Sequence, residues 1–305
     1  MLIYEKETVA KPFLKWAGGK GQLIEQIENH LPRSVTLTGK IKKYFEPFVG
    51  GGAIFFWLSQ EYRIEEAFLY DVNPEIIIAY QTIQSKTKAL ISGLRDIERE
   101  YFHTKKEKGE KYFYDRRIEY NGFISSKVDN HKVRRTALII FLNKTCFNGL
   151  FRVNTKGLFN VPFGRYENPN ICDEENLLAT SSALQNAEIA CCDFSECLKH
   201  AVKESFIYFD PPYRPISKTA SFTGYIKNGF DDNEQRRLKL VFDKLDAIGA
   251  DVMLSNSDPK NIDPKDNFFD DLYDKYEIHR LDATRMINCN SSKRGLIKEI
   301  LITNY

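Results

Sequence analysis

Seven short segments are rich in β-branched and aromatic residues and are bounded by turn or helix signals, a pattern that predicts β-strands. They are Lys43–Phe48, Ala67–Val72, Glu188–Asp193, Phe206–Phe209, Asp251–Ser255, Glu277–Leu281 and Glu299–Thr303. Helix-period stretches, such as Ala53–Ser59, Asn73–Ile83 and Asn233–Ile248, lie between several of them. Strands that alternate with helices predict an α/β fold around a mostly parallel sheet.

The interval from about Tyr80 to Ala187 departs from this alternation. It begins with charged helical sequence, continues into an apolar helix and ends in an aromatic, basic and Asn/Gly-rich stretch. That stretch predicts a β-hairpin with its turn near Lys156-Gly157. We interpret the interval as an insertion. Residues 1–79 and 188–305 are expected to form one domain, and residues 80–187 a second.

Charge is distributed unevenly along the chain. The 305 residues carry a formal net charge of only +2, yet the segment from Lys127 to Tyr166 holds eight Lys or Arg against one acid, Asp129. This segment is therefore the candidate surface for a polyanion. A solvated basic surface with no partner is the alternative, and charge alone does not decide between them.

Cysteine spacing and hydropathy argue against several other classes of protein. The six cysteines form no Cys-x-x-Cys pair and no Cys/His cluster of zinc spacing, so no metal site is expected. Free thiols are typical of a reducing cytoplasm. The segment Met1–Lys11 is charged where a signal peptide is apolar, and the longest apolar run, Ala137–Leu142, is far shorter than the roughly 20 residues of a membrane span. We expect a soluble cytoplasmic protein.

The most informative motif is Asp210-Pro211-Pro212-Tyr213, which closes the apolar run Phe206–Phe209. The Asp210 carboxylate and the Pro211 carbonyl can each accept a hydrogen bond from an exocyclic amine. Tyr213 offers a ring face for stacking, and neither proline has an N–H that competes. The motif therefore predicts a site for a flat ring that bears an NH2 group. An ordinary strand-to-loop turn is the alternative.

A second set of features predicts a nucleotide-like pocket. Gly50-Gly51-Gly52 follows the first predicted strand and precedes a helix, where backbone without side chains lets a ligand approach closely. Asp71 follows about 20 residues later at the end of the second strand, the usual place for an acid that binds ribose hydroxyls. Asp71 could equally cap the helix that begins near Pro74. The segment lacks the Gly-Lys-Ser/Thr of a P-loop.

The segment Pro12–Lys20 contains Trp16 and Lys20 on either side of a glycine turn. One interpretation is a helix start packed by a tryptophan. The other places Trp16 against a ligand and Lys20 near a carboxylate.

Taken together and in order, these motifs resemble the Dam-type DNA adenine-N6 methyltransferases of bacteria and phages. The segments that carry the resemblance are Pro12–Lys20, Phe45–Gly52, Asp71, Phe147–Asn154, Phe159–Tyr166 and Asp210–Tyr213. It extends from about Pro12 to Tyr305. It implies a Rossmann-like sheet, S-adenosylmethionine as methyl donor, double-stranded DNA as partner, and a target-recognition insertion. The pattern is most similar to members that methylate the adenine of GATC.

The resemblance also implies roles for individual residues. Asp210, Pro211, Pro212 and Tyr213 form the catalytic motif. The expected cofactor contacts are Trp16, Ala17, Gly18, Lys20, Pro47, Phe48, Gly50, Asp71 and Asp210, with Asp193 and Phe194 at the cofactor's adenine ring. The expected DNA contacts are Lys15, Phe147, Asn148, Leu150, Arg152, Asn154, Pro162, Arg165 and Tyr166.

Three of these residues have a more specific expectation. Arg152 can read guanine O6 and N7 bidentately, and Arg165 can bind phosphate instead. Phe147 is a candidate wedge for the gap that a flipped adenine leaves, or a core phenylalanine.

Other functions remain open at this point. They are a methyltransferase that acts on cytosine N4, RNA or protein, a DNA-binding homologue without catalysis, and a nicotinamide oxidoreductase. A monomer or weak dimer is expected.

Overall fold

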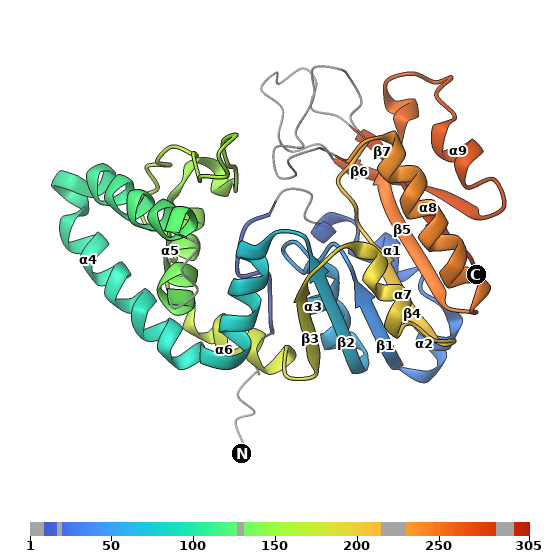
Figure 1. Cartoon of the computed structure of the whole chain (residues 1–305), viewed down its shortest axis with the longest axis horizontal. Helices are drawn as coiled ribbons and strands as arrows, with labels where there is room; N and C mark the ends of the chain where they lie inside the picture. Colours follow the sequence, from blue (N-terminus) through green and yellow to red (C-terminus); the bar gives the residue numbers. More distant parts are fainter. Residues whose placement is uncertain (1–8, 17–19, 127–130, 215–229, 285–295) are drawn as a thin grey trace, which may run out of the picture. The chain divides into compact units, whose positions relative to one another are not determined.

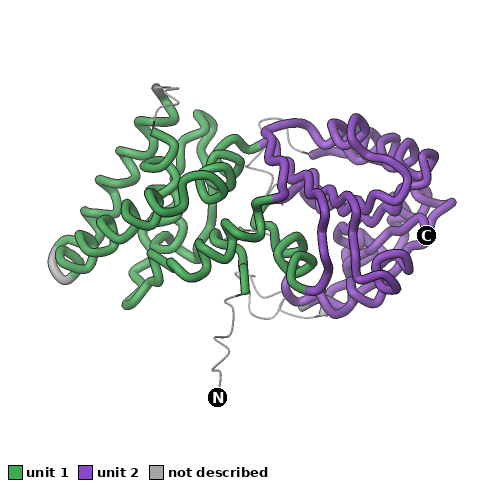
Figure 2. Tube along the Cα trace, turned by 90° about the horizontal axis from the view of Figure 1, so that it is seen from below, with its two compact units in different colours: residues 1–19, 50–60, 73–185 green, residues 20–49, 61–72, 186–305 purple. Residues whose placement is uncertain are grey.

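The computed structural model describes residues 9–16, 20–126, 131–214, 230–284 and 296–305 (Figure 1). Its Cα packing divides the chain into two compact units (Figure 2). Unit 1 comprises residues 1–19, 50–60 and 73–185, and unit 2 comprises residues 20–49, 61–72 and 186–305. All of the candidate DNA contacts fall in unit 1, and the Asp210–Tyr213 motif falls in unit 2.

Unit 2 contains a seven-stranded sheet in the order β3-β2-β1-β4-β5-β7-β6. The strands are β1 Lys40–Glu46, β2 Arg63–Asp71, β3 Ala187–Cys191, β4 Ser205–Phe209, β5 Asp251–Ser257, β6 Glu277–Thr284 and β7 Leu296–Thr303. Strands β1 to β5 pair in parallel, whereas β7 is antiparallel to both of its neighbours, β5 and β6. All seven predicted strands are present, and the sheet is mixed but mostly parallel.

The strand order creates a switch point beside β1, because β2 lies on one side of β1 and β4 on the other. In open α/β sheets, ligands bind beyond the carboxyl ends of the strands at such a point. The segments that follow β1, β2, β3 and β4 are therefore where the fold favours a site.

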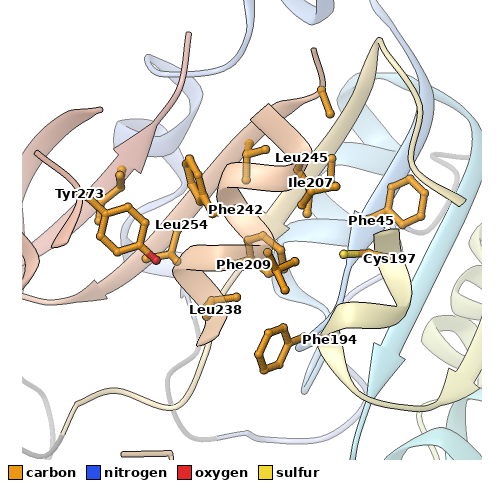
Figure 3. Close-up of a cluster of buried hydrophobic side chains, with 14 of the residues drawn as sticks. Phe45, Phe194, Cys197, Ile207, Phe209, Leu238, Phe242, Leu245, Leu254 and Tyr273 are labelled. Carbon is orange, nitrogen blue, oxygen red and sulfur yellow. The ribbon is translucent and has the colours of Figure 1, made fainter. Parts of the chain in front are cut away.

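A hydrophobic core covers one face of this sheet (Figure 3). Helix α8 (Asp232–Ala247) is capped at its N-terminus by Asp231, whose side chain accepts hydrogen bonds from the amides of Asn233 and Glu234. Its buried stripe, which includes Leu238, Phe242 and Leu245, packs with Ile207 and Phe209 of β4. Complete burial of each such side chain contributes about 1.5–3 kcal/mol, so this face holds β4, and with it the start of the Asp210 motif, in place.

Shorter helical elements complete unit 2. They are η1 Lys20–Gln22, α1 Ile24–Glu28, α2 Arg33–Thr38, η4 Phe194–Glu196, α7 Cys197–His200, η5 Pro259–Asn261 and α9 Phe268–Leu272.

Unit 1 is mainly helical. Helix α4 (Pro74–Ser126) contains non-helical backbone at Lys86 and Lys108, so it is three helical segments joined end to end. It packs against α5 (Lys132–Thr145) and α6 (Glu174–Ala183). Most of α3 (Ala53–Glu61) also belongs to this unit.

The predicted β-hairpin is present only in part. Its turn forms as expected, with the amide of Gly157 donating to the carbonyl of Asn154 at 2.8 Å. The flanking chain, however, makes isolated antiparallel bridges, one of them between Val153 and Phe159, and no strand. Beside the turn, the ladder consists of the bonds from the amide of Asn154 to the carbonyl of Leu158 and from the amide of Asn160 to the carbonyl of Arg152. The carbonyl of Asn160, which the next ladder bond would use, accepts from Nη2 of Arg152 at 3.4 Å instead. The amide and carbonyl of Phe159 face away from this ladder and bond the side chain of Asn121, at 2.9 and 3.1 Å.

Candidate active site

The Asp210 carboxylate lies just beyond β4, in contact with a buried lysine. Nζ of Lys20 is 2.7 Å from Oδ1 of Asp210 and 2.5 Å from the hydroxyl of Tyr213. Lys20 is only 3% exposed, whereas the Asp210 side chain is 21% exposed. The Lys20 ammonium is thus shielded from water, whereas the carboxylate that it contacts still reaches solvent. Lys20 lies near a carboxylate, as one interpretation of the sequence expects.

Only one oxygen of Asp210 is engaged by the described residues. Oδ1 accepts hydrogen bonds from Lys20 and from Oγ of Ser255, the latter at 3.1 Å. Ser255 in turn bonds the Tyr208 hydroxyl at 3.0 Å, which fixes its orientation. No described residue donates a hydrogen bond to Oδ2 of Asp210. This oxygen is available to accept an N–H from a ligand.

The Pro-Pro turn presents a second acceptor. The carbonyl of Pro212 accepts a hydrogen bond from Nε2 of Gln235 at 3.3 Å, and Asn256 bonds both Gln235 and the amide of Arg214. These contacts hold the turn from its far side. Among the described residues, no donor reaches the carbonyl of Pro211. Asp210 and Pro211 are adjacent in sequence, so two acceptors that no described residue engages both follow β4.

Tyr213 is held by its hydroxyl. That hydroxyl accepts from Lys20 and donates to Oε2 of Glu299, while Nζ of Lys20 lies 4.6 Å from the centre of the ring. Burial, together with the charges of Asp210 and Glu299, raises the pKa of the Tyr213 hydroxyl well above its usual value. The hydroxyl therefore remains protonated at neutral pH and fixes the edge of the ring.

The acids at the neighbouring strand ends differ in their surroundings. Asp71 is the last residue of β2 and is partly exposed. Asp193, just after β3, accepts two hydrogen bonds from the guanidinium of Arg237, at 2.8 and 2.7 Å, and two from Ser195, at 3.0 and 2.6 Å. The hydrogen bonds from Arg237 lower the pKa of the Asp193 carboxyl to about 2. This carboxylate is thus firmly ionised.

Phe194, which follows Asp193, and Phe48 belong to a cluster of packed aromatic rings. The Arg237 guanidinium lies 4.0 Å from the centre of the buried Phe194 ring. The ring centres of Phe48 and Phe194 are 5.3 Å apart, and Phe48 is partly exposed. Pro47, which precedes Phe48, is buried. Phe48 is therefore the more accessible of the two rings.

In unit 1, Trp16 and Gly50 lie in direct contact. A Cβ atom on Gly50 would come within 2.8 Å of Cδ1 of Trp16, and the φ of Gly50 is +45°. Both facts require glycine at this position. Trp16 also contacts the Phe151 ring, which stacks on it at a centre-to-centre distance of 5.1 Å. The predicted cofactor contacts Ala17 and Gly18 lie outside the described residues.

Also in unit 1, a buried asparagine joins Lys15 to the segment that follows α5. Oδ1 of Asn143 accepts from the amide of Lys15 at 2.8 Å, and its Nδ2 donates to the carbonyls of Lys15 (3.0 Å) and Gly149 (2.9 Å). Nζ of Lys15 lies 5.5 Å from the centre of the Tyr166 ring. Two predicted DNA-contacting segments, remote in sequence, are thus joined by one side chain, and Lys15 in turn lies near Tyr166 of a third.

The exposed residues of this assembly differ in how their side chains are held. Phe147 is 52% exposed, so its interpretation as a core phenylalanine is wrong. Nε of Arg152 donates to Oδ1 of Asn160 at 2.8 Å, which orients an otherwise exposed guanidinium. Asn154 instead uses its side-chain oxygen to accept the amides of Lys156 and Leu158, which stabilises the turn.

The remaining predicted DNA contacts are less constrained. Arg165 is exposed and lies 3.5 Å from Glu110. Pro162 is exposed, and its carbonyl accepts the amide of Phe147 at 2.9 Å. Leu150 is partly buried, and Asn148 is exposed with φ at +56°.

Comparison with known proteins is decisive. The profile of the D12 class N6 adenine-specific DNA methyltransferases matches residues 16–287. This chain belongs to that family. The type II methyltransferase M.MjaIII of Methanocaldococcus jannaschii is 47% identical over 296 residues, which cover 97% of this chain and 99% of that protein.

Two further relatives align with this chain over similar lengths. The type II methyltransferase M1.LlaDCHI of Lactococcus lactis subsp. cremoris is 38% identical, covering 100% of this chain and 99% of its own. A DNA adenine methylase of Salmonella typhi is 33% identical, covering 95% of this chain and 94% of its own. Among solved structures, a precorrin 8w decarboxylase aligns over 98% of this chain and 100% of its own with a TM-score of 0.37 and 9% identity, a likeness too distant to support a conclusion.

The D12 class protein is therefore a site-specific, adenine-specific DNA methyltransferase, as predicted. The nicotinamide oxidoreductase alternative is wrong. No helix in the described ranges has the length and apolar character that a membrane crossing requires. In the same ranges, no group of three or more His, Cys, Asp or Glu side chains could hold a metal ion.

Several residues of this D12 class site were not found from the sequence. Ser255 bonds Asp210, Arg237 bonds Asp193, and Glu299 accepts from Tyr213. Asn143 joins Lys15 to Gly149. Glu299 could have been singled out from the sequence, because it is an acid within the largely apolar strand Leu296–Thr303. Arg237 lies on an amphipathic helix among other charges and has no distinguishing signal.

Proposed function

We propose that this enzyme transfers the methyl group of S-adenosylmethionine to N6 of an adenine in double-stranded DNA, within GATC or a closely related site. The observation that carries the proposal is a pair of acceptors that no described residue engages, Oδ2 of Asp210 and the carbonyl of Pro211, in the motif that ends with the ring of Tyr213. An amino group has two N–H bonds, and two adjacent acceptors match them.

The chemistry that these residues perform is electrostatic. The N6 lone pair of adenine is delocalised into the ring, which makes the nitrogen a poor nucleophile. Acceptance of both N–H groups by Asp210 and Pro211 draws the nitrogen towards tetrahedral geometry and stabilises positive charge that develops on it. Lys20 and Ser255 hold Oδ1, so Asp210 acts as a fixed acceptor rather than as a mobile base. The proton leaves to water after transfer.

The residues at the strand ends fit the cofactor. S-adenosylmethionine supplies an electrophilic methyl group on a positively charged sulfur. The carboxylates of Asp71, Asp193 and Asp210 follow strands that are close neighbours in the sheet order. Asp71 offers an acceptor for ribose hydroxyls and Asp210 one for a cation. The Asp193 carboxylate already accepts four hydrogen bonds, and its contact with the cofactor's adenine ring remains a prediction. Phe48 supplies an accessible aromatic ring beside Phe194.

The other expected cofactor contacts remain predictions. They are Trp16, Ala17, Gly18, Lys20, Pro47 and Gly50.

For DNA, we propose that residues 80–187, with Lys15, form the target-recognition part. Asn160 accepts from Nε of Arg152 at 2.8 Å and from Nη2 at 3.4 Å, and Arg152 would read a guanine through the N–H groups of its terminal nitrogens that these bonds do not use. The exposed Phe147 would fill the gap left by the flipped adenine, and flipping costs a few kcal/mol. The basic residues between Lys127 and Tyr166 would add affinity that depends on salt rather than on sequence.

The names of two relatives, both type II methyltransferases, favour a role in restriction–modification. Activity in the cytoplasm, as a monomer or weak dimer, remains a prediction.

The direct test uses a duplex library, labelled S-adenosylmethionine and mapping of the modified base. We expect label on adenine N6 at one short sequence, also in the presence of EDTA. Asp210→Ala should lower kcat by about 10²–10³-fold, the range for loss of one preorganised hydrogen-bonding group. Asp282→Asn, which removes an exposed acid that pairs with Lys298, is the control. Substantial turnover by Asp210→Ala, or label on another base, would contradict the proposal.

A further inference from the structure

Two carboxylates flank the buried ammonium of Lys20. Nζ is 2.7 Å from Oδ1 of Asp210 and 3.9 Å from Oε2 of Glu299. The Glu299 side chain is 14% exposed, so all three charges are largely shielded from water. Counted over these three described residues, one cation and two anions give a formal charge of −1.

The antiparallel end of the sheet brings Glu299 to this position. In β7, Glu299 pairs with Ser257, the last residue of β5, and Leu301 pairs with Ser255. Because β7 runs against β5, an early residue of β7 lies at the edge where β4 and β5 end. Glu299 is 86 residues from Tyr213 in sequence, and the sheet joins them through a hydrogen bond.

We propose that Glu299 is a positioning residue for methyl transfer, and that it does two things. It supplies the charge that keeps the Lys20–Asp210 pair negative, as a site for a sulfonium cation requires. It also holds the Tyr213 ring by accepting its hydroxyl hydrogen. This inference rests on the proposed function.

The physical reason lies in the balance of charge. Lys20 alone would neutralise Asp210, and a neutral pair attracts neither a sulfonium nor the positive charge that develops on N6. In a desolvated cluster, such charges act on one another strongly. Burial raises the pKa of the Glu299 carboxyl, and Lys20 and the Tyr213 hydroxyl oppose the rise by favouring the charged form.

The test compares two cofactors that differ in charge at sulfur. S-adenosylmethionine carries a sulfonium, and S-adenosylhomocysteine, the product, carries a neutral thioether. In Glu299→Gln, the amide oxygen still accepts the Tyr213 hydroxyl, and only the charge is lost. We expect its Kd for S-adenosylmethionine to rise about tenfold, its Kd for S-adenosylhomocysteine to change less than about twofold, and kcat to fall.

The matched control is Glu188→Gln. Glu188 also accepts from a tyrosine, Tyr70 at 3.4 Å, but it lies near the start of β3, away from the carboxyl edge. This variant should leave both Kd values unchanged. Equal changes for the two cofactors in Glu299→Gln, or no change at all, would overturn the inference.

Glu299→Asp tests the charge independently of the reach of the side chain. It should keep the preference for S-adenosylmethionine even where the contact with Tyr213 is lost, and loss of that preference would count against the inference. Failure of the wild-type enzyme to bind either cofactor would instead contradict the proposed function. The two failures are therefore distinguishable.

Discussion

At the scale of single residues, the site depends on which atoms are already engaged. Asp210 uses Oδ1 for Lys20 and Ser255, and Arg152 uses Nε for Asn160. These hydrogen bonds, with a second from Nη2 of Arg152 to the Asn160 carbonyl, fix both side chains, and no described residue bonds Oδ2 of Asp210 or Nη1 of Arg152. Preorganisation of this kind lowers the entropy that binding would otherwise cost.

Arg152 provides a prediction at this scale. Arg152→Ala should lower discrimination at one base pair of the target by about 1–3 kcal/mol, because a bidentate contact to guanine is lost. The measurement is kcat/KM on duplexes substituted at each position. Arg165→Ala, an exposed arginine of the same segment, is the control and should weaken all duplexes by a similar factor. Unchanged selectivity in Arg152→Ala would exclude a base-reading role.

At the scale of elements, the end of helix α5 organises the candidate DNA surface. Asn143 is 1% exposed, and its amide joins α5, Lys15 and Gly149 through three hydrogen bonds. The fit is close, since a Cβ on Gly149 would lie 2.3 Å from the Lys15 side chain. The position of Lys15 therefore depends on a helix more than 100 residues away.

Asn143→Leu should leave two carbonyls and one amide without their partner. Each buried unsatisfied group costs about 1–3 kcal/mol, so stability should fall, and selectivity at the base pair that depends on Lys15 should fall with it. Urea unfolding and kcat/KM on substituted duplexes measure the two effects. Thr136→Val is the control, because Thr136 is equally buried on α5 and bonds only Thr82. The Thr136→Val variant should be less stable than the wild type, with unchanged selectivity. If Asn143→Leu also kept the selectivity of the wild type, the organising role of Asn143 would be refuted.

At the scale of the whole molecule, the chain passes repeatedly between two compact units. The segment that follows β1 illustrates this, because Phe48 belongs to unit 2 and Gly50 to unit 1. Charge pairs such as Asp193–Arg237 link elements that are distant in sequence within unit 2 and couple its stability to pH.

The Asp193 carboxyl has a pKa of about 2 in the folded protein, against an ordinary value of 3.8. A depressed pKa means that the unfolded chain binds the proton more readily, so the contribution to stability is fully present above about pH 4. It is lost as the pH falls from about 4 to 2. Urea unfolding over this pH range should show that the free energy of unfolding falls more steeply for the wild type than for Asp193→Asn. Parallel curves would mean that the pair with Arg237 does not stabilise the fold.

The sequence by itself determined the seven strands, the order of the motifs and the family, because periodicity, turn residues and short motifs are local properties. Asp210, Pro211 and Tyr213 are within four positions, so their shared role can be read without coordinates. Only the tertiary structure decided the partners of these residues. Lys20 reaches Asp210 across 190 positions, and Glu299 reaches Tyr213 across 86, because strand order and direction set which side chains meet. Asn121 likewise bonds the amide and carbonyl of Phe159, 38 positions away, a contact that no local pattern specifies.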